Sequence, residues 1–170
     1  DHELIELMEQ TGSKIQSFID LEDQIIDCEK QIKSVSNELK KLSESLTDKR
    51  RSKTSELEKA AVRLLQLLGM EFAQFKIELK ESPDFTENGK DQIDFLFSAN
   101  KGSTVKPIKN QASGGELSRL NLVLKSLVAK KSQLPTMIFD EIDTGVSGQV
   151  ALQMGNILKE MSSNQQLITI

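Results

Sequence analysis

The sequence predicts an α/β domain preceded by a long coiled-coil helix, and three observations support this fold class. Apolar residues in the first third recur alternately every three and four positions, glycine and proline are scarce there, and strand-like and helix-like segments alternate afterwards. Only Gly12 lies among the first sixty residues, and the first proline is Pro83. We therefore expect a helical arm over residues 1–60 and a globular lobe over residues 61–170.

The composition excludes several classes of protein. Hydrophobic residues make up 37% and charged residues 28% of the 170 residues, which is too apolar for a disordered chain. The absence of Trp and Tyr argues against a stacking platform for single-stranded nucleic acid. One cysteine, Cys28, excludes an internal disulfide and favours a reducing cytosol. No apolar run approaches the roughly 20 residues that span a bilayer, so we expect a cytoplasmic protein with no membrane partner.

The predicted arm carries one a/d seam of apolar residues over about four heptads. Its members are Phe18, Leu21, Ile25, Cys28, Ile32, Val35, Leu39, Leu42 and Leu46. The seam resumes at Leu57, one heptad plus four residues later, which is a stutter that locally unwinds a supercoil. Because this chain offers no second helix of similar length, another chain or another part of the same polypeptide must supply it. A long amphipathic helix packed on the lobe remains the alternative.

Two local features of the arm carry separate predictions. Thr11, Gly12 and Ser13 predict a break or turn near the start of the chain. Lys49, Arg50, Arg51 and Lys53 form a basic cluster that fits a contact with a phosphate backbone, although a solvated stretch at the stutter explains it more simply.

The lobe reads as two strands followed by alternating helices and strands. We expect strands at 75–79 and 93–97 that pair antiparallel across a long connection, a loop over 100–107, helices at 117–129 and 150–161, and strands at 137–139 and 166–170. Strand, helix and strand in this order, with both late strands apolar throughout, predict a parallel α/β core.

The first motif that carries chemistry is the segment from Ala112 to Glu116 at the start of a predicted helix. Adjacent Gly114 and Gly115 let backbone N–H groups approach an anion, and the helix N-terminus adds partial positive charge. The Ser113 hydroxyl is suited to a phosphate oxygen. Ser113 and Glu116 are also spaced as a capping box, which needs no ligand, and both interpretations stay open.

The second motif is an apolar strand that ends in two carboxylates, Asp140 and Glu141. A buried strand delivers Asp140 to the carboxyl edge of the sheet, where ligands bind in open α/β folds. Its carboxylate suits Mg²⁺, which prefers oxygen ligands and retains waters. Glu141 points elsewhere and is suited to orient an attacking water, although acidic strand ends also serve as caps or solvated turns.

Together the two motifs resemble a known family. The segments ASGGELSR at 112–119 and IFDEIDTGVSG at 138–148 are similar to the C-terminal head of the RecN family, within the SMC-like branch of ABC ATPases. Residues 57–170 match this family in sequence. The arm matches it only in its coiled-coil character. The resemblance implies the C-terminal half of an ABC/SMC-type P-loop ATPase head with an N-terminal antiparallel-type coiled-coil arm.

The resemblance also implies roles for individual residues. Ser113, Gly114, Gly115 and Glu116 match the ABC signature, which binds ATP held by a second copy of the head. Asp140 matches the aspartate that supports Mg²⁺, through water, and Glu141 matches the catalytic base. Asp143, Thr144 and Gly145 match the D-loop at the contact between heads, and Ser147 stands where many ABC proteins have Asp.

The sequence contains no G-x-x-x-x-G-K-[ST] P-loop, so we expect that loop in an N-terminal half of the same protein. The resemblance implies an ATPase with ATP and Mg²⁺ as cofactors, DNA and a second head as partners, and a nucleoid-associated role in double-strand break repair and recombination. This fragment alone is expected to be inactive. The rivals are a chromosome-organisation ATPase of the SMC, SbcC or RecF kind, and a purely structural coiled-coil protein.

Overall fold

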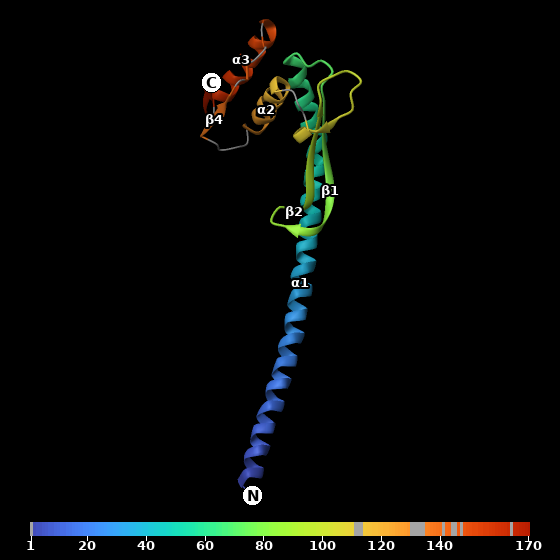
Figure 1. Ribbon diagram of the computed structural model, residues 1–170, viewed down its shortest axis with the longest axis vertical. Helices are drawn as coiled ribbons and strands as arrows, with labels where there is room; N and C mark the ends of the chain where they lie inside the picture. Colours follow the sequence, from blue (N-terminus) through green and yellow to red (C-terminus); the bar gives the residue numbers. More distant parts are fainter. Residues whose placement is uncertain are drawn as a thin grey trace. The chain divides into compact units, whose positions relative to one another are not determined.

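The computed structural model describes residues 2–110, 114–129, 135–140, 142–143, 146, 148–163 and 165–170 (Figure 1). The chain divides into two compact units, Asp1–Leu46 and Thr47–Ile170. The boundary that the sequence predicted at residue 60 lies inside a helix, and the assignment of an arm and a lobe as separate domains stays a prediction.

Helix α1, His2–Leu67, runs without interruption, so the predicted break at residues 11–13 is wrong. Thr11 remains helical and donates from Oγ1 to the Leu7 carbonyl at 2.7 Å. One glycine costs a helix interior about 1 kcal/mol, which a long cooperative helix tolerates. A Cβ on Gly12 would meet nothing within 4 Å, so no tertiary contact requires glycine there either.

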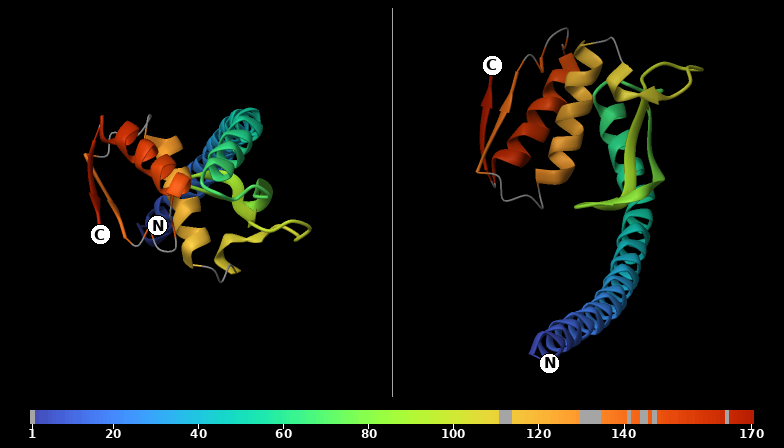
Figure 2. Two further views of the ribbon diagram at one scale, coloured as in Figure 1. Left: turned by 90° about the horizontal axis from the view of Figure 1, so that it is seen from above. Right: turned by 60° about the horizontal axis from the view of Figure 1, so that its bottom comes forward.

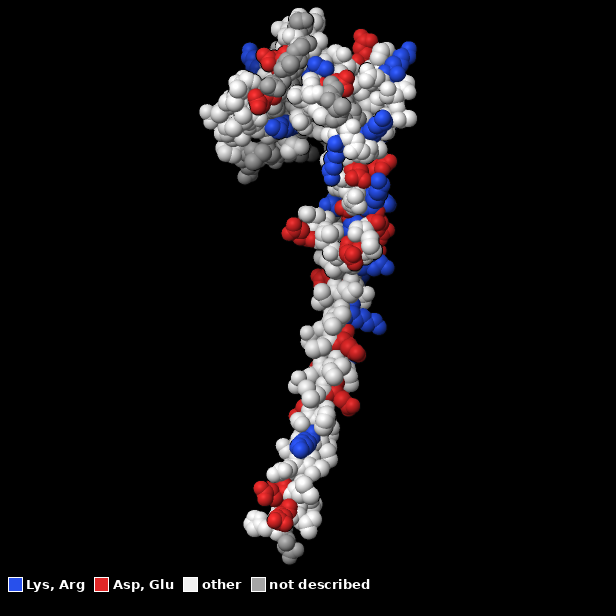
Figure 3. Space-filling view, in the orientation of Figure 1, with Lys and Arg blue, Asp and Glu red and all other residues white. Residues whose placement is uncertain are grey.

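The seam of the first unit is exposed along the single helix. Phe18 and Ile32 are each 68% exposed, and Leu42 is 63% exposed. Acidic and basic side chains are interspersed along α1 rather than gathered into a patch of one sign (Figure 3). An exposed apolar seam between charged flanks is typical of a helix that pairs with another helix.

The second unit begins with a long antiparallel hairpin. Strand β1, Gln74–Thr86, pairs with β2, Gly89–Ser98, in a register that places Phe75 opposite Phe97 and Thr86 opposite Gly89. Only two residues join the strands, and Gly89 takes a φ of 89° that suits glycine. The long connection predicted from the sequence is therefore wrong. Strand β1 continues through Pro83 because it is an edge strand with an irregular register after Glu81.

The predicted loop over 100–107 ends in a short strand. Strand β3, Lys106–Pro107, pairs antiparallel with β2, which gives the sheet order β1-β2-β3. A 3₁₀ turn, η1, follows at Ile108–Asn110. The loop prediction was wrong for these two strand residues because their pairing with Leu96 and Phe97 depends on tertiary structure rather than local pattern.

A partly buried ionic cluster connects the hairpin tip to α1. Arg50 donates from Nη1 to Oδ2 of Asp91 at 2.7 Å and from Nη2 to the Asn88 carbonyl at 2.9 Å. The Thr47 hydroxyl donates to Oδ1 of Asp91 at 2.8 Å. Nearer the core, Glu58 of α1 accepts a hydrogen bond from the Ile77 backbone amide at 2.8 Å. The hairpin is thus held along α1 at two points.

The rest of the second unit has the predicted alternation. Helix α2, Gly114–Ala129, precedes β4, Thr136–Phe139, and helix α3, Gly148–Ser162, precedes β5, Gln166–Thr169. The two strands pair in parallel, as predicted. Within this unit, α2 and α3 lie between the β4–β5 pair and the hairpin (Figure 2).

One hydrophobic core joins these elements. Its fully buried large side chains are Leu65, Leu68, Phe75, Phe97, Leu120, Leu122 and Val123. Met137 and Phe139 extend the core beneath β4, whereas Ile138 on the other face of that strand is 54% exposed. The β4–β5 sheet therefore has one covered face and one uncovered face. In the part of the chain that the structure describes, no helix is both long and apolar enough to cross a bilayer.

Candidate nucleotide site

The start of α2 presents the first predicted site. Gly114 is the first residue of the helix, is exposed, and would have nothing within 4 Å of an added Cβ. The first backbone N–H groups of a helix have no partner within it and favour an anion. Gly115 and Glu116 continue this first turn. Ser113 lies outside the described residues, so its role as cap or phosphate donor stays a prediction.

The carboxyl end of β4 carries the second predicted site. Asp140 follows the strand directly and is exposed. Asp143 is also exposed, and its carbonyl accepts a hydrogen bond from the Val146 amide at 3.0 Å, which closes a turn. Glu141, Thr144 and Gly145 lie outside the described residues, and their predicted roles are untested by the geometry.

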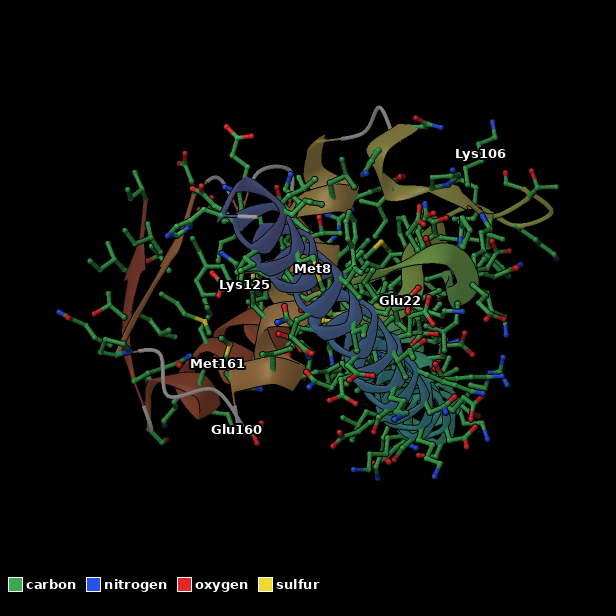
Figure 4. All side chains as sticks on the ribbon, turned by 90° about the horizontal axis from the view of Figure 1, so that it is seen from below. Met8, Glu22, Lys106, Lys125, Glu160 and Met161 are labelled. Atoms are coloured by element: carbon green, nitrogen blue, oxygen red, sulfur yellow. The ribbon has the colours of Figure 1, made fainter. Side chains whose placement is uncertain are left out.

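Lys125 of α2 is a residue near this strand end that the sequence analysis missed (Figure 4). Its Nζ donates to the Ile138 carbonyl at 3.2 Å and lies 4.8 Å from the Phe139 ring centroid. The contact places a cation beside the end of β4. No local pattern marks Lys125, because its role depends on how α2 packs against the strand.

The described residues of the two predicted site segments lie on different elements, the first turn of α2 and the stretch after β4. The contact between α2 and β4 lies at Lys125, which is about 16 Å along the helix from Gly114 at a rise of 1.5 Å per residue. Among the described residues, no hydrogen bond or ion pair joins Asp140 to Gly114, Gly115 or Glu116.

The described residues contain no group of three or more His, Cys, Asp or Glu side chains able to hold a metal ion. A single exposed carboxylate such as Asp140 still fits Mg²⁺ that arrives with a nucleotide. Mg²⁺ in such sites takes one or two carboxylates and fills its remaining positions with waters and phosphate oxygens.

A cavity of about 270 Å³ lies beside the first turns of α2. It is lined by Gly69 to Phe72, by Ala99 to Lys101, and by Glu116 and Arg119. Nε of Arg119 is buried and has no hydrogen-bond partner among the described residues. The motif that contains Arg119 was recognised in the sequence, but this cavity depends on the turn after α1 and was not predicted.

Comparison with curated proteins decides the family. The DNA repair protein RecN of Rickettsia typhi is 44% identical over 125 residues, covering 74% of this chain and 23% of that protein. RecN of Aquifex aeolicus is 47% identical over 107 residues, covering 63% of this chain and 20% of that protein. The chain is a relative of RecN. It matches the C-terminal region of RecN and spans about a quarter of the length of these relatives.

Solved structures show the same fold. An Smc head domain with an extended coiled coil, from Pyrococcus furiosus and bound to the C-terminal domain of ScpA, gives a TM-score of 0.50 at 21% identity, covering 67% of this chain and 27% of that chain. An Smc head with a coiled coil and joint from Pyrococcus yayanosii gives 0.51 at 24% identity, covering 67% and 21%. No profile of a protein family matches. The predicted fold class, part of an SMC-type head with its coiled-coil helix, is confirmed.

Proposed function

We propose that this chain is the C-terminal part of a RecN-like ATPase of the SMC family that acts in DNA double-strand break repair and recombination. The observation that carries the proposal is the identity of 44% to a DNA repair protein RecN, over a segment with a glycine-rich start at α2 and an acidic end at β4. Its working location is the cytoplasm, at the nucleoid, where its DNA partner lies. The RecN likeness disfavours a chromosome-organisation ATPase and a purely structural coiled coil.

The complete head requires an N-terminal half of the same protein that brings the P-loop. The sequence has no P-loop of its own, and the β4–β5 sheet leaves Ile138 54% and Ile168 40% exposed. Sheets of parallel strands are normally covered on both faces. A further layer from the N-terminal half would cover these side chains and also supply the second helix of the arm.

Asp140 and Glu141 carry the chemical step at the end of β4. ATP bound with Mg²⁺ supplies the phosphoryl group and the charge that polarises it. Asp140 would hold the Mg²⁺, and its exposed position after β4 supports that role. Glu141 orients the attacking water and accepts its proton.

The start of α2 serves the nucleotide of a second head. The signature face meets the γ-phosphate of that nucleotide. It consists of Ser113, the N–H groups of Gly114 and Gly115, and Glu116. The resemblance of residues 113–116 to the ABC signature supports a site shared between two copies. Asp143, Thr144 and Gly145 lie at the contact between heads in this proposal.

The test is Glu141→Gln in the protein that contains both halves. We expect ATP to bind, steady hydrolysis to fall by at least about a hundredfold, and ATP-dependent dimers to accumulate in size-exclusion chromatography. Glu87→Gln, an exposed residue in the hairpin turn, is the matched control. Unchanged hydrolysis by Glu141→Gln would remove Glu141 from the mechanism. Steady hydrolysis by the 170-residue chain alone would contradict the assignment of the P-loop to another segment.

A further inference from the structure

The side of β4 that faces away from β5 has no strand partner among the described strands, because the parallel sheet consists of β4 and β5 alone. On the other side, the Gln166 amide donates to the Pro135 carbonyl and the Ile170 amide donates to the Phe139 carbonyl, each at 2.9 Å. Successive residues of a strand turn their N–H and C=O groups to opposite sides. Ile138 therefore directs both of its backbone polar groups to the open side of β4.

Lys125 of α2 occupies this open side. Its Nζ donates to the Ile138 carbonyl at 3.2 Å and lies 4.8 Å from the Phe139 ring centroid. Lys125 itself is exposed, so the carbonyl is bound by a side chain that remains in contact with water. An ammonium group on a flexible four-carbon stem is a displaceable donor, since it regains hydrogen bonds to water when this one breaks. Lys125 therefore takes the position of a neighbouring strand in a reversible way.

Three observations indicate that this sheet is larger in the complete protein. Sheets usually contain about four to six strands, whereas β4 and β5 form a pair of only four residues each. Parallel sheets are normally covered on both faces, yet Ile138 is 54% and Ile168 is 40% exposed. The chain also matches only 23% of the length of RecN from Rickettsia typhi. A further strand beside Ile138 would extend a sheet that is incomplete in this chain.

We propose that Lys125 is a displaceable cap on the open side of β4, where a strand from the N-terminal half of the protein takes over the Ile138 carbonyl and amide. The identity of that incoming strand rests on the proposed function. Before the strand pairs, Lys125 prevents β4 from pairing with other strands, as lysines at exposed sheet edges do in natural proteins. Once the strand is paired, the Lys125 ammonium moves into solvent.

The charge of Lys125 explains how the cap discriminates between partners. A second copy of this chain that paired through the same side of β4 would bring its own Lys125 to the shared ladder. Two ammonium groups that face each other across a pair of strands repel, which disfavours the pairing. The strand of the N-terminal half meets a single ammonium group, which is free to move into solvent. The cap therefore opposes self-association through β4 and still permits assembly of the complete sheet.

Amide hydrogen exchange measured by NMR tests the cap in the 170-residue chain. The Ile138 amide is the probe, because it lies on the open side, and the amides of Met137 and Phe139 on the β5 side are internal references. In Lys125→Met, which removes the donor and the charge, Ile138 exchange is expected to slow at least about tenfold as the protein concentration rises, because copies pair through β4. The parent and Lys125→Arg should show no such dependence. Lys159→Met, at an exposed position of α3, is the matched control and shares any association through α1.

The full-length protein tests the incoming strand. Its Ile138 amide is expected to exchange at least about tenfold more slowly than in the 170-residue chain, because that amide is then paired. Circular dichroism confirms that each variant is folded. Fast exchange of Ile138 in the full-length protein would overturn the docking of a strand at β4, and concentration-independent exchange in Lys125→Met would overturn the cap. Absence of ATP hydrolysis by the full-length protein would contradict the proposed function, whereas the exchange rates would still decide the role of Lys125.

Discussion

Arg50 of α1 and Asp91 of β2, which are 41 residues apart in sequence, form an ion pair at 2.7 Å in which the Asp91 side chain is only 4% exposed. The hydrogen bond from Arg50 holds the pKa of Asp91 below its usual value, and the Thr47 hydroxyl acts in the same direction, while burial opposes both. Arg50 is therefore a structural residue. For this member of the basic cluster, the pairing disfavours a role in phosphate contact.

Arg50→Ala is expected to destabilise the second unit by about 2–3 kcal/mol, because it leaves a buried carboxylate without its cation. Urea unfolding followed by circular dichroism measures the change. A double-mutant cycle with Asp91→Ala should show positive coupling, since each single change removes the same pair. Lys53→Ala, which breaks an exposed pair with Glu56, is the control and should leave the midpoint unchanged. Additive effects of Arg50→Ala and Asp91→Ala would contradict the pairing.

The same carboxyl predicts a dependence of stability on pH. Because the pKa of Asp91 is lowered in the folded protein, the unfolded chain binds the proton more tightly and acid favours unfolding. The contribution is fully present above about pH 5, where Asp is ionised in both states, and is lost as the pH falls through the folded pKa, below about 3.9. Asp91→Asn should lose less stability than the parent between pH 5 and pH 3 in urea titrations. Equal losses of stability by Asp91→Asn and the parent over this pH range would show that Asp91 does not cause the pH dependence.

Substitution of Gly69, in the turn after α1, is expected to destabilise the second unit for two separable reasons. Its φ is 81°, and a Cβ there would lie 3.0 Å from Cγ2 of Val150 in α3. Gly69→Ala should destabilise the unit by about 1–3 kcal/mol in thermal unfolding. Gly102→Ala isolates the backbone cause, since Gly102 has a φ of 75° and open space around it. An equal loss of stability at both positions would show that Val150 moves away from the added Cβ without a measurable free-energy cost.

Gly12→Ala is expected to stabilise the first unit by about 0.5–1 kcal/mol, because glycine in a helix interior loses more backbone entropy than alanine. The measurement is thermal unfolding followed at 222 nm, with an exposed Ser13→Ala change as the control for side-chain effects. A decrease in helicity would mean that the chain needs glycine to turn at this position, contrary to the continuous helix described above.

The elements that the sequence predicted correctly are those with a strong local pattern. The alternation around Phe75 and Phe97 and the apolar helix after Gly114 needed no tertiary information. The strand continuation past Glu81 was missed because Ser82, Pro83 and Asp84 are typical of a turn, whereas the hairpin tip is held by Arg50 from another element. Local sequence does not encode such a contact.

The residues of the candidate site fall into the same two groups, those marked by a local motif and those placed by tertiary packing. The motifs identified Gly114, Gly115, Glu116, Asp140 and Asp143. In the structure the first three lie in the first turn of α2, Asp140 directly follows β4, and Asp143 lies in the turn beyond it. Lys125 and Arg119 were not singled out, because their surroundings arise from the packing of α2 against β4 and of α2 against the turn after α1. Ser113, Glu141, Thr144 and Gly145 lie outside the described residues and stay predictions.

Strand β3 is two residues long, and one of them is Pro107. Proline has no N–H to offer a neighbouring strand, and so short a strand presents almost no ladder. The β3 side of the antiparallel sheet therefore resists further growth, because a strand from another polypeptide finds almost no backbone ladder to pair with there.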